Sequence, residues 1–328
     1  MVTKLSKRAY ILLGSLLIFA LLPLAIGDNR HLMHLLIMSF IWATVAASWD
    51  VIMGYARVYN FAHLAFFGLG GYTSAMLTKV YLGISPWLGI LAGGGVALAI
   101  GLLIALPCLR LRGMYVGMVT FAVHIVLPLL ARAGLAIGTG GSWGIRDLPR
   151  LYVGQYIFTS LELVPWYYVA LAMFAGFSFA IYKIINSPLG LAFMALRDSE
   201  PLAKSLGIDD YRHTFILFGV SAFIAGVCGA FYCHYMGVVD PGIFSLANFL
   251  FGFVILMLGG LAAFPGAVIA AFPLVFLNNA LLPLLELRLV ILGAIVMGVL
   301  IGLPRGIMEI PEAVNRLIRQ RASKRTSG

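Results

Sequence analysis

Long apolar segments, separated by short polar or Gly/Pro-containing breaks, make up most of this 328-residue chain. A membrane-spanning helix needs about 20 apolar residues, because each residue advances it about 1.5 Å through a hydrocarbon layer about 30 Å thick. The pattern predicts ten spans, at 9–26, 32–53, 60–78, 88–109, 114–135, 166–185, 213–236, 249–263, 266–285 and 288–303. The third is rich in glycine and the eighth is short. Both are candidate pathway elements, because interrupted segments are tolerated within a membrane only against protein or along a water-filled path.

One polar segment, 187–212, interrupts this pattern with seven charged residues between two apolar segments. Such a segment lies in water rather than in hydrocarbon. Ser187-Pro188 is typical of an N-cap followed by the first residue of a helix. Ser199-Glu200-Pro201 indicates a second start, and Gly207 can end that helix in the left-handed conformation. We therefore expect two short helices outside the membrane.

Composition supports an all-α, polytopic transmembrane bundle that forms a single domain over residues 1–328. The chain is 62% hydrophobic and 10% charged, against about 45–50% and about 25% in soluble domains. Its mean hydropathy is +1.02. No basic stripe with exposed aromatic residues lies outside the spans, so the net charge of +10 indicates membrane topology rather than a nucleic-acid partner.

The distribution of Lys and Arg predicts the orientation of the spans. With both termini in the cytoplasm, 16 of the 22 basic residues lie inside and six outside, namely Arg30, Lys79, Arg132, Arg146, Arg150 and Arg288. Segment 187–212 is then cytoplasmic, and 136–165 is the longest external segment. Residues 9–26 read as an uncleaved first span, because they are long for a signal peptide and no cleavage site follows. The basic, amphipathic tail 304–328 is expected to lie against anionic lipid in the cytoplasm.

Motifs for enzyme chemistry are absent. The sequence contains no GxxxxGK[ST], HExxH or GxSxG motif, so it predicts neither a nucleotide site nor a hydrolytic site. We expect no metal, no cofactor and no catalytic residue in this chain. Three cysteines, Cys108, Cys228 and Cys233, are expected to be buried as small apolar residues.

Few ionisable residues fall within the predicted spans, and the main ones are Asp50, His63, His124, Arg132 and His234. So few buried acids disfavour a proton-coupled or cation-coupled transporter. Asp50 lies near the end of its span, where capping or snorkelling explains it as well as function does. His124 and His234 are isolated, which favours hydrogen-bonded structural histidines.

Two further stretches are candidates for the transport path. Residues 54–72, GYARVYNFAHLAFFGLGGY, combine small residues with Asn, His and Tyr. Glycines allow helices to approach closely or a backbone to unwind, and the polar side chains can line a path. On the external side, the glycines of TGGSWGI at 139–145 permit positive φ and exposed amides that could meet a carboxylate.

Six segments in order resemble permease subunits of the ATP-binding cassette (ABC) importers for branched-chain, hydrophobic amino acids. They are GYARVYNFAHLAFFGLGGY at 54–72, LRLRGMYVGMVTFA at 109–122, TGGSWGI at 139–145, SPLGLAFMALRDSEPLAKSLGI at 187–208, FGVSAFIAGVCGAFYCHYMGVVDPGIF at 218–244 and LGGLAAFPGAVIAA at 258–271. The LRLRGMY element is similar to the longer of the two permease paralogues. The resemblance implies an inner-membrane subunit that forms half of a heterodimeric pore.

The resemblance also implies partners and a coupling element. Partners would be a second permease, two cytoplasmic ATPases that bind the ATP, and an external solute-binding protein. The segment 187–212 resembles the coupling loop that docks on the ATPase. The residues that match its pattern are Gly190, Ala195, Arg197, Glu200, Ala203 and Gly207. We expect the small side chain of Ala203 to permit close approach of the ATPase, and Leu189, Phe193 and Leu196 to form a packing face.

The chain departs from the family pattern at Arg57, Asn60 and Ala62, where Gly, Ser and Gly are usual, and at Leu191, where a basic residue is common. These departures leave urea or short-chain amides open as alternative substrates. A stand-alone secondary transporter or channel is the alternative of another class, and a membrane-embedded enzyme is disfavoured. The substrate-path candidates are Arg57, Tyr59, Asn60, His63, Thr139, Gly140 and Gly141.

Overall fold

The computed structural model describes residues 18–24, 26–27, 29–111, 113–159, 162–284, 287–302 and 306–307. The helices are α2 (Arg30–Asp50), α3 (His63–Ala75), α4 (Pro86–Cys108), α5 (Met114–Ala133), α6 (Leu163–Ile185), α7 (Pro188–Asp198), α8 (Glu200–Ser205), α9 (Asp210–Met236), α10 (Leu246–Gly259), α11 (Gly266–Ala280) and α12 (Leu287–Gly302). Two π-helical turns, η1 (Val51–Tyr55) and η2 (Met76–Tyr81), extend α2 and α3. The 3₁₀ turns are η3 (Gly134–Ile137), η4 (Gly141–Trp143), η5 (Pro241–Phe244) and η6 (Leu282–Leu284).

Five helical stretches are long and apolar enough to cross a membrane: α2 with η1, α4, α5, α6 and α9. They match five of the predicted spans. The remaining apolar helices α3, α10, α11 and α12 are shorter, so the predicted count of ten remains a prediction. The segment predicted at 60–78 becomes helical only at His63, and the short α10 ends at Gly259. The predicted span 9–26 and the tail 304–328 fall largely outside the described residues.

Two groups of helices build the bundle. α3, α4 and α9 pack on one another, while α2 packs on α6, α10 and α11 and also on α9. Small residues make the first group tight: a Cβ on Gly70 would lie 2.1 Å from the carbonyl oxygen of Gly226. Gly70 and Gly71 therefore serve the packing of α3 on α9, and Gly68 makes room for the ring of Phe244. The alternative that the backbone unwinds at these glycines is wrong, because all three lie within α3.

The backbone is interrupted elsewhere. Between η1 and α3 the chain is non-helical, and side chains satisfy its polar groups. The indole Nε1 of Trp49 donates to the carbonyl of Asn60 at 2.7 Å, and the amide of Phe61 donates to Thr120 Oγ1 at 3.0 Å. A second interruption, β4 and η5, separates α9 from α10.

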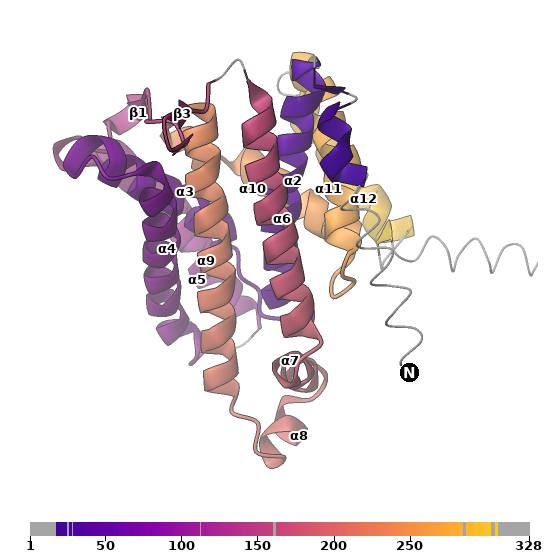
Figure 1. Ribbon diagram of the computed structural model, residues 1–328. Coiled ribbons are helices and arrows are strands. Elements are labelled where there is room, and N and C mark those ends of the chain that lie inside the picture. The colour runs from indigo at the N-terminus through magenta and orange to yellow at the C-terminus, as the bar shows by residue number, and fades with distance from the viewer. Residues whose placement is uncertain are drawn as a thin grey trace, which may run out of the picture.

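The two ends of the bundle carry different structures (Figure 1). The short helices α7 and α8 project from one end, and the strands lie at the other. β1 (Ile145–Arg146) pairs antiparallel with β4 (Val238–Val239), and β2 (Tyr152–Val153) pairs with β3 (Tyr156–Ile157). Segments 187–212 and 136–165 thus lie at opposite ends, as the charge assignment requires.

Candidate functional site

The segment 187–212 folds into two short helices, as its prolines predict. α7 begins at Pro188 and α8 at Glu200, although neither preceding serine caps its helix through the side chain. Gly207 has φ +81 and ends α8. Its amide donates to Lys204 O at 3.0 Å, and the amide of Ile208 donates to Ala203 O at 3.1 Å. These two bonds satisfy the last carbonyls of α8 in the manner of a Schellman motif.

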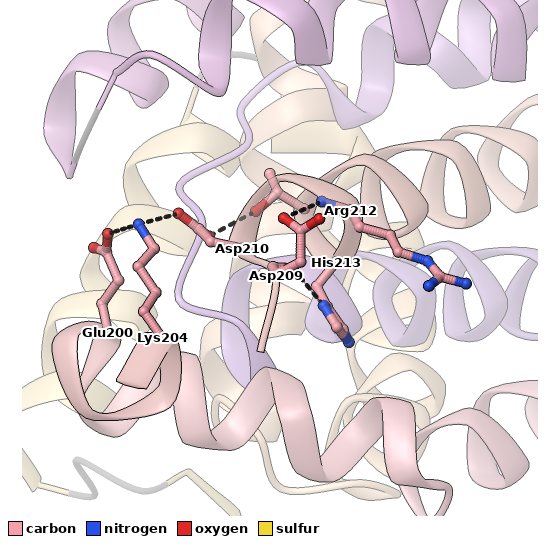
Figure 2. A network of polar contacts seen from close by, with 7 residues as sticks. Glu200, Lys204, Asp209, Asp210, Arg212 and His213 are labelled. Atoms are coloured by element: carbon pink, nitrogen blue, oxygen red, sulfur yellow. Dashed lines mark hydrogen bonds and ion pairs between the residues drawn. The ribbon is translucent and has the colours of Figure 1, made fainter. Parts of the chain in front are cut away.

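Ion pairs join α8 to the start of α9 (Figure 2). Lys204 Nζ lies 2.6 Å from Glu200 Oε1 and 3.2 Å from Asp210 Oδ2. Asp210 Oδ1 in turn accepts from Thr214 Oγ1 at 3.3 Å. The hydrogen bond to Glu200, followed by that to Asp210, raises the pKa of Lys204. The loop is therefore a connected unit, while the guanidinium of Arg212 points away from this network.

Three predicted coupling residues pack against this chain itself. A Cβ on Gly190 would lie 2.1 Å from the carbonyl oxygen of Ile185, so Gly190 lets α7 fold back on the end of α6. Ala203 is 1% exposed. This chain itself covers Ala203, so its small side chain permits close packing within the loop, and its coupling role remains a prediction. Ala195 accepts from the amide of Ser199 at 3.0 Å between the two helices.

The most exposed apolar side chains of the loop are not among the predicted coupling residues. Leu191, Leu202 and Leu206 are 63%, 61% and 73% exposed. The predicted packing face divides: Phe193 is buried, whereas Leu189 is 38% exposed. The family pattern does not include the three leucines, and Leu191 differs from it, so matches to that pattern do not indicate them. The sequence feature that could have indicated them is a leucine without an apolar neighbour on a polar, water-exposed helix.

A hollow of about 610 Å³ lies between this loop, the η1–α3 connection and the α4–α5 connection. Arg57, Arg110, Arg197, Lys204 and Asp210 are among its lining residues. Arg197 pairs with Asp198 at 2.9 Å. Arg57 has a positive φ of 58, which is uncommon for a residue with a Cβ.

The seven substrate-path candidates therefore fall in three places. Arg57 is exposed beside the loop, whereas Asn60 and His63 are fully buried and Tyr59 is half-buried. His63 Nε2 lies 3.0 Å from Ser48 Oγ and 3.1 Å from Val45 O. The Thr139-Gly140-Gly141 turn lies near the strands at the other end.

That turn has the conformation expected of its glycines. Gly140 and Gly141 have φ values of +75 and +58, so the predicted positive φ is confirmed, but Gly141 is buried rather than exposed. Thr139 Oγ1 donates to the carbonyl of Ala131 at 2.7 Å, and the amide of Gly141 donates to Thr139 Oγ1 at 3.4 Å. The threonine thus fixes the turn to the end of α5.

Asp50 caps backbone rather than snorkelling to water. It is 2% exposed, and its Oδ1 accepts from the amide of Ala262 at 2.8 Å. The Tyr55 hydroxyl accepts from the amide of Phe264 at 3.2 Å. Together they fix the α10–α11 connection against the end of α2, a contact between residues about 210 positions apart that the sequence alone did not indicate.

The two isolated histidines differ. His234 is hydrogen-bonded as predicted, with Nε2 2.7 Å from Ser74 Oγ and Nδ1 2.7 Å from Pro149 O. For His124 the prediction is wrong: it is 3% exposed, and neither ring nitrogen has a hydrogen-bond partner among the described residues.

The cysteine prediction is confirmed, since Cys108, Cys228 and Cys233 are free and buried. Within the described residues, no group of three or more His, Cys, Asp or Glu side chains could hold a metal ion. The fold is that of a polytopic helical membrane protein with a structured polar loop at one end of its bundle.

Residues 31–300 match the family model of the branched-chain amino acid transport system permease component, and the chain belongs to this family. It is 28% identical to the high-affinity branched-chain amino acid transport system permease protein LivM of Escherichia coli K12, over 90% of this chain and 75% of LivM. LivH of the same organism is also 28% identical, over 83% of this chain and 92% of LivH. BraD of Pseudomonas aeruginosa is 24% identical, over 70% of this chain and 78% of BraD.

No solved structure matches the chain. The family is one of transport permeases, so the chain is a multi-pass membrane permease subunit and not an enzyme. Its similarity is of the longer, LivM type. Likeness to both LivM and LivH implies an ABC importer with a second permease.

Proposed function

We propose that this chain forms half of the pore through which an ABC importer brings branched-chain or other hydrophobic amino acids across the inner membrane. Membership of the permease family supports the transport role. The named specificity of LivM, LivH and BraD supports this substrate class over urea or short-chain amides.

The remaining partners are two cytoplasmic ATPases, which bind the ATP, and an external solute-binding protein that delivers the substrate. Both termini and the segment 187–212 face the cytoplasm in this proposal. The distribution of Lys and Arg supports that orientation, as does the position of α7 and α8 at the end opposite the strands.

The observation that carries the coupling role is a rigid loop with an exposed apolar surface. Leu191 in α7, Leu202 in α8 and Leu206 just after α8 are exposed, and both helices project from the bundle. We define these three side chains as the docking leucines. Gly190 joins α7 to α6, and Lys204 joins α8 to α9. Movement of an ATPase bound to the docking leucines would therefore reach two spanning helices as a rigid-body displacement.

The matched coupling residues then act in different ways. Gly190, Ala203 and Gly207 give the loop its shape, and Glu200 orients Lys204. Ala195 accepts the amide that ends α7. Arg197 faces the hollow that also contains Arg57.

The seven path candidates would lie along the route in order. Arg57 and Tyr59 would shape the cytoplasmic mouth, Asn60 and His63 its interior, and Thr139-Gly140-Gly141 the external mouth. The position of Arg57 beside the loop, and of Gly140 next to Gly144 and β4 at the strand end, supports the two ends of this order.

Cross-linking tests the coupling role. Leu202→Cys and Leu206→Cys should each form a disulfide or short cross-link with an ATPase subunit in the assembled complex. Val153→Cys, equally exposed at the opposite end, is the control and should not. Reconstituted wild-type complex with its binding protein should take up leucine and not urea. Absence of any ATPase adduct from the two loop cysteines would contradict the docking assignment.

A further inference from the structure

The hollow beside the polar loop collects charged side chains from three parts of the chain. Its walls come from the η1–α3 connection, the α4–α5 connection and the helices α7 to α9. Its volume of about 610 Å³ is in the range of sites that hold a small molecule or a headgroup. Four of the lining residues are basic and three are acidic, namely Arg57, Arg110, Arg197 and Lys204 against Asp198, Glu200 and Asp210.

Two of the four basic side chains have no partner. Within the loop, Arg197 and Lys204 already hold the three acidic groups in ion pairs. Arg57 and Arg110 have no ion pair and no side-chain hydrogen bond among the described residues. A guanidinium group binds phosphate or carboxylate oxygens through parallel hydrogen bonds. The hollow therefore has two guanidinium groups that a negatively charged ligand would neutralise.

The backbone places Arg57 in an unfavourable conformation. Its φ of 58 lies in the left-handed region, where a Cβ comes too close to the following carbonyl oxygen. The next residue is fixed to the preceding helix, because the amide of Val58 donates to Ile52 O at 3.1 Å. Residues held in such conformations are concentrated at sites that bind ligands. At Arg57 an unfavourable backbone conformation thus coincides with an unpaired charge.

The hollow lies where two spanning helices reach the end of the bundle that carries α7 and α8 (Figure 1). α4 ends at Cys108 and α5 begins at Met114, and both Cys108 and Gly113 line the hollow. Met114 and Tyr115, which follow Gly113, are exposed, as is Leu106 on α4. An exposed tyrosine at the end of a spanning helix is typical of the headgroup region of a membrane. The hollow therefore opens at the level of the lipid headgroups.

We propose that this hollow binds the phosphate group of an anionic phospholipid, and that Arg57 and Arg110 hold that group. In the proposed orientation, on which this assignment rests, the hollow faces the cytoplasmic leaflet, which carries anionic lipid. Basic pockets between spanning helices on that side are suited to such headgroups. None of the docking leucines lines the hollow, so an ATPase bound to them does not fill it through that contact. Arg57 would then shape the cytoplasmic mouth by holding a lipid at its edge.

The test titrates the detergent-solubilised complex with phosphatidylglycerol or with phosphatidylcholine, and native mass spectrometry counts the bound lipid. The wild type should bind phosphatidylglycerol more tightly than phosphatidylcholine. Arg57→Gln and Arg110→Gln should each weaken phosphatidylglycerol binding about fivefold, and the double variant about 25-fold, with phosphatidylcholine binding unchanged. Arg212→Gln is the matched control, because Arg212 is a basic residue of the same loop that does not line the hollow. It should bind both lipids as the wild type does.

Three results would overturn the lipid site. The first is equal phosphatidylglycerol binding by the double variant and the wild type. The second is displacement of the lipid by inorganic phosphate at the same concentration, which would indicate a free anion. The third is a cross-link from Arg110→Cys to an ATPase subunit that blocks lipid binding, which would show that the ATPase fills the hollow. Labelling of Ser205→Cys only from the outside would instead contradict the proposed orientation, whereas the titration reports on the hollow itself.

Discussion

Gly190 and Gly176 show how the structural role of a glycine depends on its surroundings. Both are helical glycines in or next to α6, but a Cβ on Gly190 would meet the Ile185 carbonyl at 2.1 Å, whereas nothing lies within 4 Å of a Cβ on Gly176. The first glycine is required by the close approach of α7 to the end of α6. Gly176 has space beside it for a larger side chain.

At this scale we predict that Gly190→Val disturbs coupling. The added side chain must displace α7 from the end of α6, an overpacking effect of about 1–3 kcal/mol. ATP hydrolysis by the assembled complex should then proceed with less leucine taken up per ATP. Gly176→Val is the matched control and should leave this ratio unchanged. An unchanged ratio of leucine to ATP in Gly190→Val would contradict a coupling role for Gly190.

At the scale of the elements, the ion pairs between α8 and the start of α9 hold the loop in its conformation. Lys204 connects Glu200 and Asp210, and this connection orients the docking leucines relative to a long spanning helix. Such exposed ion pairs add little to global stability, so their effect is on local order.

We predict that Lys204→Gln increases hydrogen exchange in the amides of α8 with little change in the melting temperature. Because the pKa of Lys204 is raised, its charge is fully present below its ordinary value and is lost only as pH rises through the raised one. The wild-type protection should therefore not decline between about pH 7 and 9, where lysine remains protonated. Arg212→Gln, which removes a guanidinium directed away from the network, is the control. Equal exchange in both variants would argue against the ion-pair role.

The whole molecule is polarised along the bundle axis. One end carries α7 and α8, and the other carries the two-stranded pairs and the Thr139-Gly140-Gly141 turn. In the proposed importer, this asymmetry would let the subunit meet an ATPase on one side and a binding protein on the other.

We predict that Ser205→Cys is labelled by a membrane-impermeant thiol reagent only from the cytoplasmic side, and Val153→Cys only from the outside. Both positions are exposed, whereas the three native cysteines are buried and should remain unlabelled in the intact protein. Labelling of intact cells and of inverted vesicles distinguishes the sides. The reverse pattern would contradict the orientation derived from the basic residues.

Several features could be predicted from the sequence because their causes are local. Hydrophobic length predicted the spanning helices α4, α5, α6 and α9, and two prolines predicted the starts of α7 and α8. The conformation of Gly207 followed from its place after a helix. Such signals depend on residues within one or two turns of each other.

Contacts between distant parts of the chain could not be read in this way. The sequence by itself determined that this is a membrane bundle with a folded polar loop, since apolar length and helix capping act over a few residues. Only the tertiary structure decided that Ala203 is covered by its own chain, that Asp50 caps Ala262 and that His124 has no partner among the described residues. Each of these depends on which side chains meet across the bundle, and helix packing, not local sequence, sets those meetings.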